Sequence, residues 1–230
     1  MLFRLRSAGC LLPFGGAGCL VVLMMGFLLA GTSVWAFKEF VAPRPESADT
    51  FPSKDAHPME KVTAAIDLYN TAPKDDIFGT KYVQEGILPV LLVITNSGDQ
   101  PISMTRMNAE LVTASKSKLE WLSVDDVFRR VAHIKANSTT PPRVGPIPLP
   151  TGMKNKKAKE QYDELSKAAF IAEAIEPHAT RSGFLFFDID TIKNPVAAGG
   201  HIYLTGIRDG SGNEMMYFEI PVAPANAAGQ

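Results

Sequence analysis

The strongest constraint on this chain is an uncharged, apolar run of 20 residues near its amino terminus, Gly18–Phe37 (GCLVVLMMGFLLAGTSVWAF). About 20 apolar residues in a helix are needed to cross a hydrocarbon core of ~30 Å. Arg4 and Arg6 precede the run, in a segment that contains no Asp or Glu. We therefore predict a short basic segment over residues 1–17, followed by a transmembrane signal anchor over residues 18–37.

Three other interpretations of this run stay open. Val34-Trp35-Ala36 could serve as a signal-peptide cleavage site. If the chain were cleaved after Ala36, the protein would be secreted. Small residues before Cys19 suggest lipoprotein processing, although the apolar run follows that cysteine instead of preceding it. A buried helix of a soluble domain is the third alternative.

The basic residues around the run indicate its orientation. Arg4 and Arg6 lie on the amino-terminal side, whereas Lys38 and Arg44 on the other side are partly balanced by Glu39. Because basic residues accumulate on the cytoplasmic side, we expect the amino terminus inside and the carboxy-terminal domain outside the membrane. The predicted location is single-pass and extracytoplasmic, periplasmic or at the cell surface, with the membrane bound through the N-terminal helix.

Charge and cysteine content exclude some classes of protein. The 193 residues after Phe37 carry 21 of the 23 basic and all 24 acidic side chains, so their net charge is −3. A nucleic-acid partner is therefore not expected, because such binding depends on neutralising phosphates. Both cysteines, Cys10 and Cys19, precede this part, which leaves no disulfide or thiolate metal site within it.

The rest of the chain divides by composition. Residues 38–58 hold four prolines, mixed charges and few large apolar groups, which predicts a tether. Residues 59–223 are long enough to form one folded domain with a sizeable core. We expect residues 224–230 to be a flexible tail.

Hydrophobic patterns within the domain predict mostly strands. Lys61–Asn70 alternates as a half-buried strand does, and Ile87–Thr95 is apolar throughout, as is typical of a central strand. The turn after Thr95 predicts a β-hairpin with Ile102–Ser115. Three further strands are expected, the first central and the other two paired as a hairpin: Ser182–Ile189, His201–Arg208 and Glu214–Val222.

Two helices interrupt this pattern. Ser123 is an expected N-cap, with Asp126 as the acidic residue of a capping box, for a helix over residues 123–131. Apolar residues at three- and four-residue spacing predict a second helix over residues 154–175. The fold predicted is mainly β, an antiparallel β-sandwich with a helical insertion, preceded by one N-terminal transmembrane helix.

Two short segments resemble known families. The strand–Asn-x-x-x-x-Pro-Ile–strand pattern of Thr95–Met104 resembles late-embryogenesis-abundant water-stress domains. Ile175–Asp188 (IEPHATRSGFLFFD) is similar to secreted or membrane-anchored bacterial immunoglobulin-like domains of unknown function. These resemblances imply that the β-sandwich is immunoglobulin-like and has binding or protective roles, and they supply no catalytic residues.

The sequence contains no motif that predicts catalysis, a cofactor site or a metal site. Asp188, Asp190, His178 and His201 are the only polar set whose convergence would support an enzyme, and Asp188 with Asp190 would be a candidate for Ca²⁺. The Asp209–Glu214 stretch departs from an EF-hand loop, which has glycine at position six. We therefore expect a protein that is not an enzyme and has no cofactor.

A cluster of four lysines is the strongest local charge feature and predicts an interaction patch: Lys154, Lys156, Lys157 and Lys159. The function predicted is a membrane-tethered extracytoplasmic interaction or structural module whose partner is another envelope protein. A secreted ligand- or ion-binding domain released after Ala36 is the first alternative, and an enzyme of unknown type is the second.

Overall fold

The computed structural model describes residues 39–133, 156–190 and 199–222. The chain divides into two compact units, Met1–Ala36 and Phe37–Gln230, and every described residue belongs to the second. The predicted signal anchor, Lys154 and the predicted tail lie outside the described residues. Within the described part, no helix is long and apolar enough to span a membrane.

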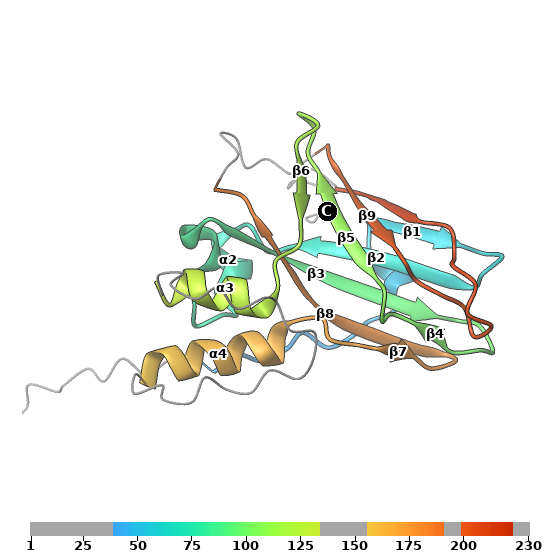
Figure 1. Ribbon diagram of the computed structural model, residues 1–230, viewed down its shortest axis with the longest axis horizontal. Coiled ribbons are helices and arrows are strands. Elements are labelled where there is room, and N and C mark those ends of the chain that lie inside the picture. Colours follow the sequence, from blue (N-terminus) through green and yellow to red (C-terminus); the bar gives the residue numbers. More distant parts are fainter. Residues whose placement is uncertain (1–38, 134–155, 191–198, 223–230) are drawn as a thin grey trace, which may run out of the picture. The chain divides into compact units, whose positions relative to one another are not determined.

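The described structure is mainly β, as the sequence predicts, and its two larger sheets are antiparallel and four-stranded (Figure 1). The inner sheet has the order β1 (Lys54–His57), β2 (Val62–Leu68), β3 (Ile87–Asn96) and β8 (Ala179–Asp188). The outer sheet has the order β10 (Phe218–Pro221), β9 (His201–Thr205), β5 (Asn108–Val112) and β6 (Lys118–Glu120). A short sheet pairs β4 (Ile102–Ser103) with β7 (Ala174–Ile175).

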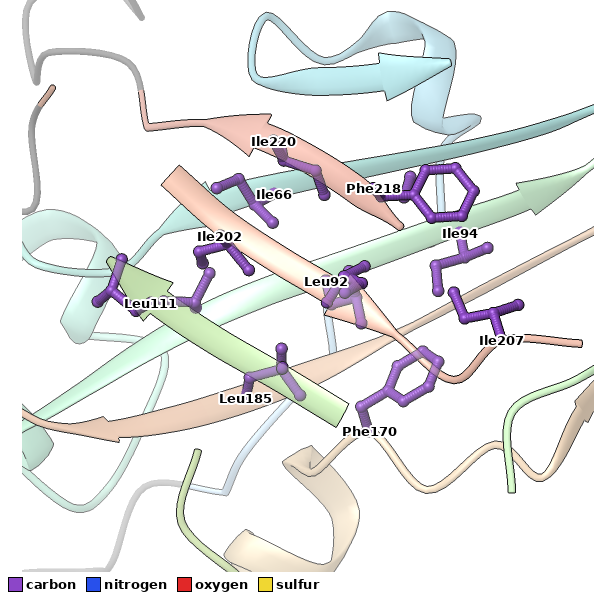
Figure 2. Close-up of a cluster of buried hydrophobic side chains, with 14 of the residues drawn as sticks. Ile66, Leu92, Ile94, Leu111, Phe170, Leu185, Ile202, Ile207, Phe218 and Ile220 are labelled. Carbon is purple, nitrogen blue, oxygen red and sulfur yellow. The ribbon is translucent and has the colours of Figure 1, made fainter. Parts of the chain in front are cut away.

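The first hydrophobic core lies between the inner and outer sheets (Figure 2). Alternate residues of each strand point into it, because successive side chains of a strand face opposite sides of the sheet. Each large apolar side chain buried there stabilises the fold by about 1.5–3 kcal/mol. The inner sheet contributes Ile66, Leu92, Ile94, Leu185 and Phe187, and the outer sheet contributes Leu111, Ile202, Leu204, Phe218 and Ile220.

The second core covers the opposite face of the inner sheet. Helices α3 (Val124–Val131) and α4 (Lys156–Ala168) pack there with two 3₁₀ turns, η1 (Ala48–Thr50) and η2 (Tyr82–Glu85). A short helix, α2 (Ala72–Asp75), precedes η2. Buried side chains of this core include Leu91, Val93, Phe184, Phe186, Phe128, Tyr162 and Leu165. Strands β2, β3 and β8 of the inner sheet are therefore covered on both faces, whereas the edge strand β1 alternates between exposed and half-buried residues.

Two predicted strands belong to this doubly covered sheet. All ten residues of β3 are buried and β3 lies between β2 and β8, so the prediction of a central strand at Ile87–Thr95 is confirmed. The half-buried pattern expected of Lys61–Asn70 is wrong, because the first five residues of β2 are buried on both faces. Small residues such as Ala65 occupy the helix-facing side, which disguised this second buried face.

The hairpin predicted between Ile87–Thr95 and Ile102–Ser115 is wrong. Both edges of β3 are already paired, with β2 on one side and β8 on the other. The Asn96 amide holds the turn by donating to the carbonyl oxygens of Gln100 (2.8 Å) and Glu176 (3.2 Å). The chain then leaves the inner sheet, pairs briefly as β4 with β7, and enters the outer sheet as β5.

The strand predicted as central at Ser182–Ile189 lies instead at the end of the inner sheet, as β8. Other segments cover its open edge: the Leu122 amide donates to Phe186 O (2.7 Å), and the Phe170 amide to Phe184 O (3.0 Å). Gly183 allows this approach, since a Cβ there would lie 2.6 Å from Phe170 Cα. Such covering protects an edge strand and lets both of its faces be apolar.

The first predicted helix is confirmed and the second is shorter than expected. Ser123 caps α3, and its hydroxyl accepts a hydrogen bond from the Asp126 amide (3.2 Å). α4 ends at Ala168, seven residues before the predicted end at Ile175. The chain leaves the helix there because Phe170 enters the core between the sheets, beside Gly183.

The segment predicted as a tether is part of the fold from Glu39 onward. Phe40 is buried and its ring stacks on Phe78 (centroids 5.4 Å apart). The amide of Ala48 donates to Thr95 Oγ1 (2.8 Å), and β1 pairs with β2. Four prolines concealed this packing, because prolines mark loops whether or not the loop is held down.

The predicted C-terminal hairpin is confirmed, since β9 pairs with β10. The loop between them is longer than the sequence suggests, because β9 ends at Thr205 and β10 begins at Phe218. Asp209 holds the turn, and its carboxylate accepts hydrogen bonds from the amides of Ser211 and Asn213 (both 2.9 Å). The Asn213 side-chain amide also donates to this carboxylate (3.1 Å), and this bond, followed by those from the backbone amides, lowers the Asp209 pKa.

Candidate functional site

The outward face of the outer sheet is the most prominent surface built from regular structure. Its opposite face fills the first core, so the remaining residues of each strand point away from the core. Each of these outward residues is half-buried or exposed: Asn108, Glu110, Val112, Lys118, Glu120, His201, Tyr203, Thr205, Glu219 and Pro221. The outer sheet therefore differs from the centre of the inner sheet, where β3 is buried on both faces.

One row of residues crosses all four strands of this face. The strand register pairs Glu120 with Glu110, Glu110 with Tyr203, and Tyr203 with Glu219. We call these four residues the acidic–aromatic row. Three carboxylates are thus aligned with one tyrosine, although like charges directly opposite each other destabilise a sheet.

Two of these carboxylates have contacts within the face. Tyr203 donates its hydroxyl hydrogen bond to Glu219 Oε1 (2.7 Å), and this bond, with lesser electrostatic contributions from nearby groups, raises the pKa of Tyr203. Lys118 Nζ lies 3.0 Å from Glu110 Oε1. Glu120 has no side-chain partner among the described residues, so the row retains unbalanced negative charge.

Aromatic and apolar side chains border the row. The Tyr217 ring lies 6.0 Å from the Tyr203 ring, measured between centroids, and Tyr217 is half exposed. Met216, the preceding residue, is 69% exposed. His201 Nε2 is 3.9 Å from Glu219 Oε1. The surface around Tyr203 therefore combines carboxylates with accessible rings.

A polar contact closes the sandwich edge next to this face, where β1 meets β10. Asp55 accepts a hydrogen bond from the Glu219 amide (2.8 Å) and Glu60 accepts one from the Met216 amide (3.2 Å). His57 lies between the two carboxylates, 3.4 Å from Asp55 and 2.7 Å from Glu60, and its ring stacks on Phe218. These contacts satisfy edge amides that would otherwise lack partners, so they have a structural role.

Glu164 is a second polar feature, in the helical layer. Its carboxylate is buried and accepts hydrogen bonds from the amides of Gly79 and Thr80 and from the Tyr82 hydroxyl (2.9 Å). Burial, together with this negative charge, raises the pKa of Tyr82 far above its ordinary value. Because its donors come from the fold itself, Glu164 holds α4 against the segment Gly79–Tyr82.

Asp75, near Glu164, is less well satisfied. Its side chain is 9% exposed, its Oδ2 lies 4.0 Å from Lys81 Nζ, and its Oδ1 has no hydrogen-bond partner in the part of the chain that the structure describes. Burial raises the pKa of Asp75, an effect that Lys81 opposes and that Asp76 and Glu164 reinforce. The ionised form is therefore disfavoured in the folded protein.

A shallow hollow of about 220 Å³ lies beside Glu164. Carboxylates line most of it, and an ion pair between Lys167 and Glu39 (3.7 Å) crosses it. The lining consists of Glu39, Phe40, Glu160, Asp163, Glu164 and Lys167. No group of three metal-ligating side chains occurs within residues 39–133, 156–190 and 199–222.

Three of the four lysines predicted as an interaction patch are described, and all three are exposed. Lys156, Lys157 and Lys159 occupy the first turn of α4, and Lys156 Nζ is 3.7 Å from Glu160. Their placement leaves them accessible to a partner. The patch stays a prediction.

The polar set predicted to support an enzyme is not brought together. His178 precedes β8 and Asp188 ends it, so a ten-residue strand of about 30 Å separates them. Arg130 pairs with Asp188 (2.7 Å) and Asp190 (3.0 Å), which satisfies the carboxylates proposed for Ca²⁺. His178 contacts Asp99 (3.3 Å) at the far turn, and His201 lies on the outer sheet.

Comparisons with known proteins add little. No family model and no curated protein matches the chain. One similar solved structure is the Northeast Structural Genomics Consortium target SoR45, with 12% sequence identity over 73% of this chain and 89% of that chain and a TM-score of 0.31. Another is a conserved hypothetical protein from Bacillus anthracis, with 9% identity over 74% of this chain and 98% of that chain and a TM-score of 0.25. At these TM-scores neither similarity supports an argument about fold or function.

The acidic–aromatic row is not visible in the sequence. Its members come from three widely separated segments, around residues 110–120, 203 and 219, and only the strand register aligns them. One signal was available: in both Lys118–Glu120 and His201–Thr205, polar or aromatic residues occupy every second position. Such alternation indicates an exposed face, but it does not identify the neighbouring strands.

Proposed function

We propose that this protein is a membrane-tethered, extracytoplasmic interaction module without catalytic activity, built on an immunoglobulin-like sandwich. The uncharged run at Gly18–Phe37 supports the tether and the orientation. Two antiparallel sheets that share one core support the sandwich. The partner is another envelope protein, which docks on the folded unit.

One observation carries this proposal: the two sheets are covered unequally. Helices cover the inner sheet, whereas the outward side chains of the outer sheet are half-buried or exposed and include the acidic–aromatic row. A broad, rigid, strand-built surface with rings and charges is suited to recognition, since tyrosine is enriched where proteins bind each other. The partner would therefore contact the outer sheet.

Site-specific photocrosslinking of the full-length protein in its native membranes tests the proposal. A photoreactive phenylalanine analogue replaces Thr205, which is exposed at the end of β9. The matched control carries the analogue at Asp163, an exposed position of α4. We expect a discrete adduct from position 205 and none of the same mass from position 163. Equal or absent adducts at both positions would contradict docking on the outer sheet.

The lysine patch is a second candidate interface, because its described members are exposed at one end of α4. The same analogue at Lys159 tests it directly. An adduct from position 159 but not from position 205 would assign docking to the helical insertion and would remove the outer sheet from the proposal.

The tether is tested separately. Sequencing the amino terminus of the mature protein distinguishes an intact anchor from a chain that begins after Ala36. We expect the intact sequence and retention in membranes after alkaline extraction. A mature chain that starts at Phe37 and is recovered in the soluble fraction would favour the alternative, a secreted ligand-binding domain.

A further inference from the structure

We propose that the acidic–aromatic row binds a basic segment of the partner, an extended stretch with arginine side chains at four-residue spacing. This inference rests on the proposed function and names the chemistry of the partner. It follows from the charge, the rings and the dimensions of the row.

The charge of the row is the first argument. Glu110, Glu120 and Glu219 are outward-facing, and Lys118 is the only outward lysine or arginine on the described strands of the outer sheet. Glu110 and Glu120 are directly opposite in the register, an arrangement that destabilises the sheet. A cationic partner would relieve this repulsion, so the surface is complementary to positive charge.

The rings favour arginine as the cation. Tyr203 is half-buried, and its hydroxyl is fixed by the hydrogen bond to Glu219, so its ring is held in one place. Tyr217 lies alongside at 6.0 Å. A guanidinium group stacks on an aromatic ring and also binds carboxylates through a planar fork of donors, whereas an ammonium group presents a compact point charge.

The dimensions of the row fit an extended segment. Neighbouring strands lie about 4.8 Å apart, so four strands place Glu120 and Glu219 about 14 Å from each other. Residues i and i+4 of an extended chain are about 13 Å apart, and their side chains point to the same side. Two arginines at this spacing would therefore reach both ends of the row at once.

Fluorescence anisotropy with the full-length protein in a non-ionic detergent provides the test. The probe is a fluorescein-labelled peptide of ten residues with arginine at every fourth position among serines and threonines. A second probe has glutamate in place of arginine. We expect the arginine peptide to bind, the glutamate peptide not to bind, and binding to weaken as salt is raised.

Two double variants locate the binding site. Glu110→Gln with Glu219→Gln removes two charges from the row, and we expect the affinity for the arginine peptide to fall roughly five- to tenfold. Glu160→Gln with Asp163→Asn removes two charges from the hollow beside α4 and should change the affinity by less than about twofold. Unfolding curves of both variants establish that each is folded.

Three results would overturn the inference: no binding of the arginine peptide, equal binding of the glutamate peptide, or equal losses from the two double variants. Equal losses would mean general attraction by negative charge. The proposed function fails separately, through the photocrosslinking result. If the adduct at position 205 forms but the arginine peptide does not bind, docking on the outer sheet is supported and only the cationic nature of the partner is rejected.

Discussion

The inner and outer sheets have the same number of strands but opposite relations to solvent. Every residue of β3 in the inner sheet is buried, whereas β9 in the outer sheet alternates between buried and accessible residues. The difference arises because, among the described residues, helices cover the second face of the inner sheet and not that of the outer sheet. Stability and recognition are thereby divided: the doubly covered sheet supplies the core, and the singly covered sheet supplies the surface.

The polar groups of the two sheets differ in the same way. Glu164, which packs against the inner sheet, receives all its hydrogen bonds from the fold. Glu120, on the outer sheet, receives none from any described side chain and faces another carboxylate. A buried charge must be satisfied within the protein, whereas an exposed charge remains available to another molecule.

Truncating one aromatic ring in each sheet should give the largest difference in the free energy of unfolding. Phe184→Ala removes a fully buried ring that contacts Phe40, Tyr69 and Phe78, and we expect a loss of about 3–5 kcal/mol in the free energy of unfolding. The outer-sheet change Tyr203→Ala should cost much less. Urea unfolding monitored by circular dichroism measures both. Similar losses would mean that the outward face of the outer sheet is buried in the protein.

A methyl group added at Gly183, where the chain after α4 crosses β8, should cause the next largest loss of stability. In Gly183→Ala the new Cβ would meet the backbone of Phe170, Cα at 2.6 Å and N at 2.8 Å. Backbone cannot move aside as a side chain can, so we expect a loss of about 1–3 kcal/mol.

Gly210→Ala is the milder control, because a Cβ there would lie 3.1 Å from Gln100 Cβ and 3.3 Å from Pro101 O, farther than the closest contacts at Gly183. Hydrogen exchange at the Phe170 amide provides a local readout. Faster exchange in the Gly183 variant is expected, since that amide bonds to Phe184 O. Unchanged exchange and stability would mean that the close approach does not hold the edge of the inner sheet.

The same comparison explains which parts of the fold could be predicted. The long apolar run of β3 and the capping serine of α3 are local signals, and both predictions are confirmed. The prediction of a hairpin after β3 is wrong because strand pairing depends on which edges are already occupied. The segment that pairs with the second edge of β3 is β8, which follows about 80 residues later.

The predicted end of α4 is wrong for a related reason. Ala169 and Ala172 continue the three- and four-residue spacing of the helix, but Gly183, on a strand, makes room for Phe170 in the core between the sheets. Tertiary packing outweighs helix propensity at such a point. The acidic–aromatic row was missed because its alignment exists only in the register of four strands.

Removing a buried charge from the layer that covers the inner sheet should stabilise the protein. Burial raises the pKa of Asp75 in the folded state, so the ionised carboxylate costs stability at neutral pH. This cost is present above the raised pKa and disappears as the pH falls below the pKa of the unfolded chain. We expect Asp75→Asn to gain about 1 kcal/mol at neutral pH, and the gain to shrink in acid.

Asp76→Asn is the control for this change. It removes the same charge from the next residue, whose carboxylate is 63% exposed and lies 2.6 Å from Lys81 Nζ. The Asp76→Asn protein should lose the ion pair with Lys81 and gain no stability. Thermal unfolding of both variants across a pH series separates the two cases, and a gain for Asp75→Asn that persists unchanged in acid would contradict the role of burial.

The smallest effect should come from the outer sheet, and its sign is the informative part. Glu120→Gln removes one of two carboxylates that face each other across β5 and β6, so we expect a gain of about 0.2–1 kcal/mol in stability. The same change should weaken binding of the arginine peptide, because one end of the acidic–aromatic row loses its charge. A variant that is more stable and binds less well is expected where a surface is kept for function at the expense of stability. If Glu120→Gln is instead destabilising, the carboxylate supports the fold, and the repulsion across the two strands no longer favours a cationic partner.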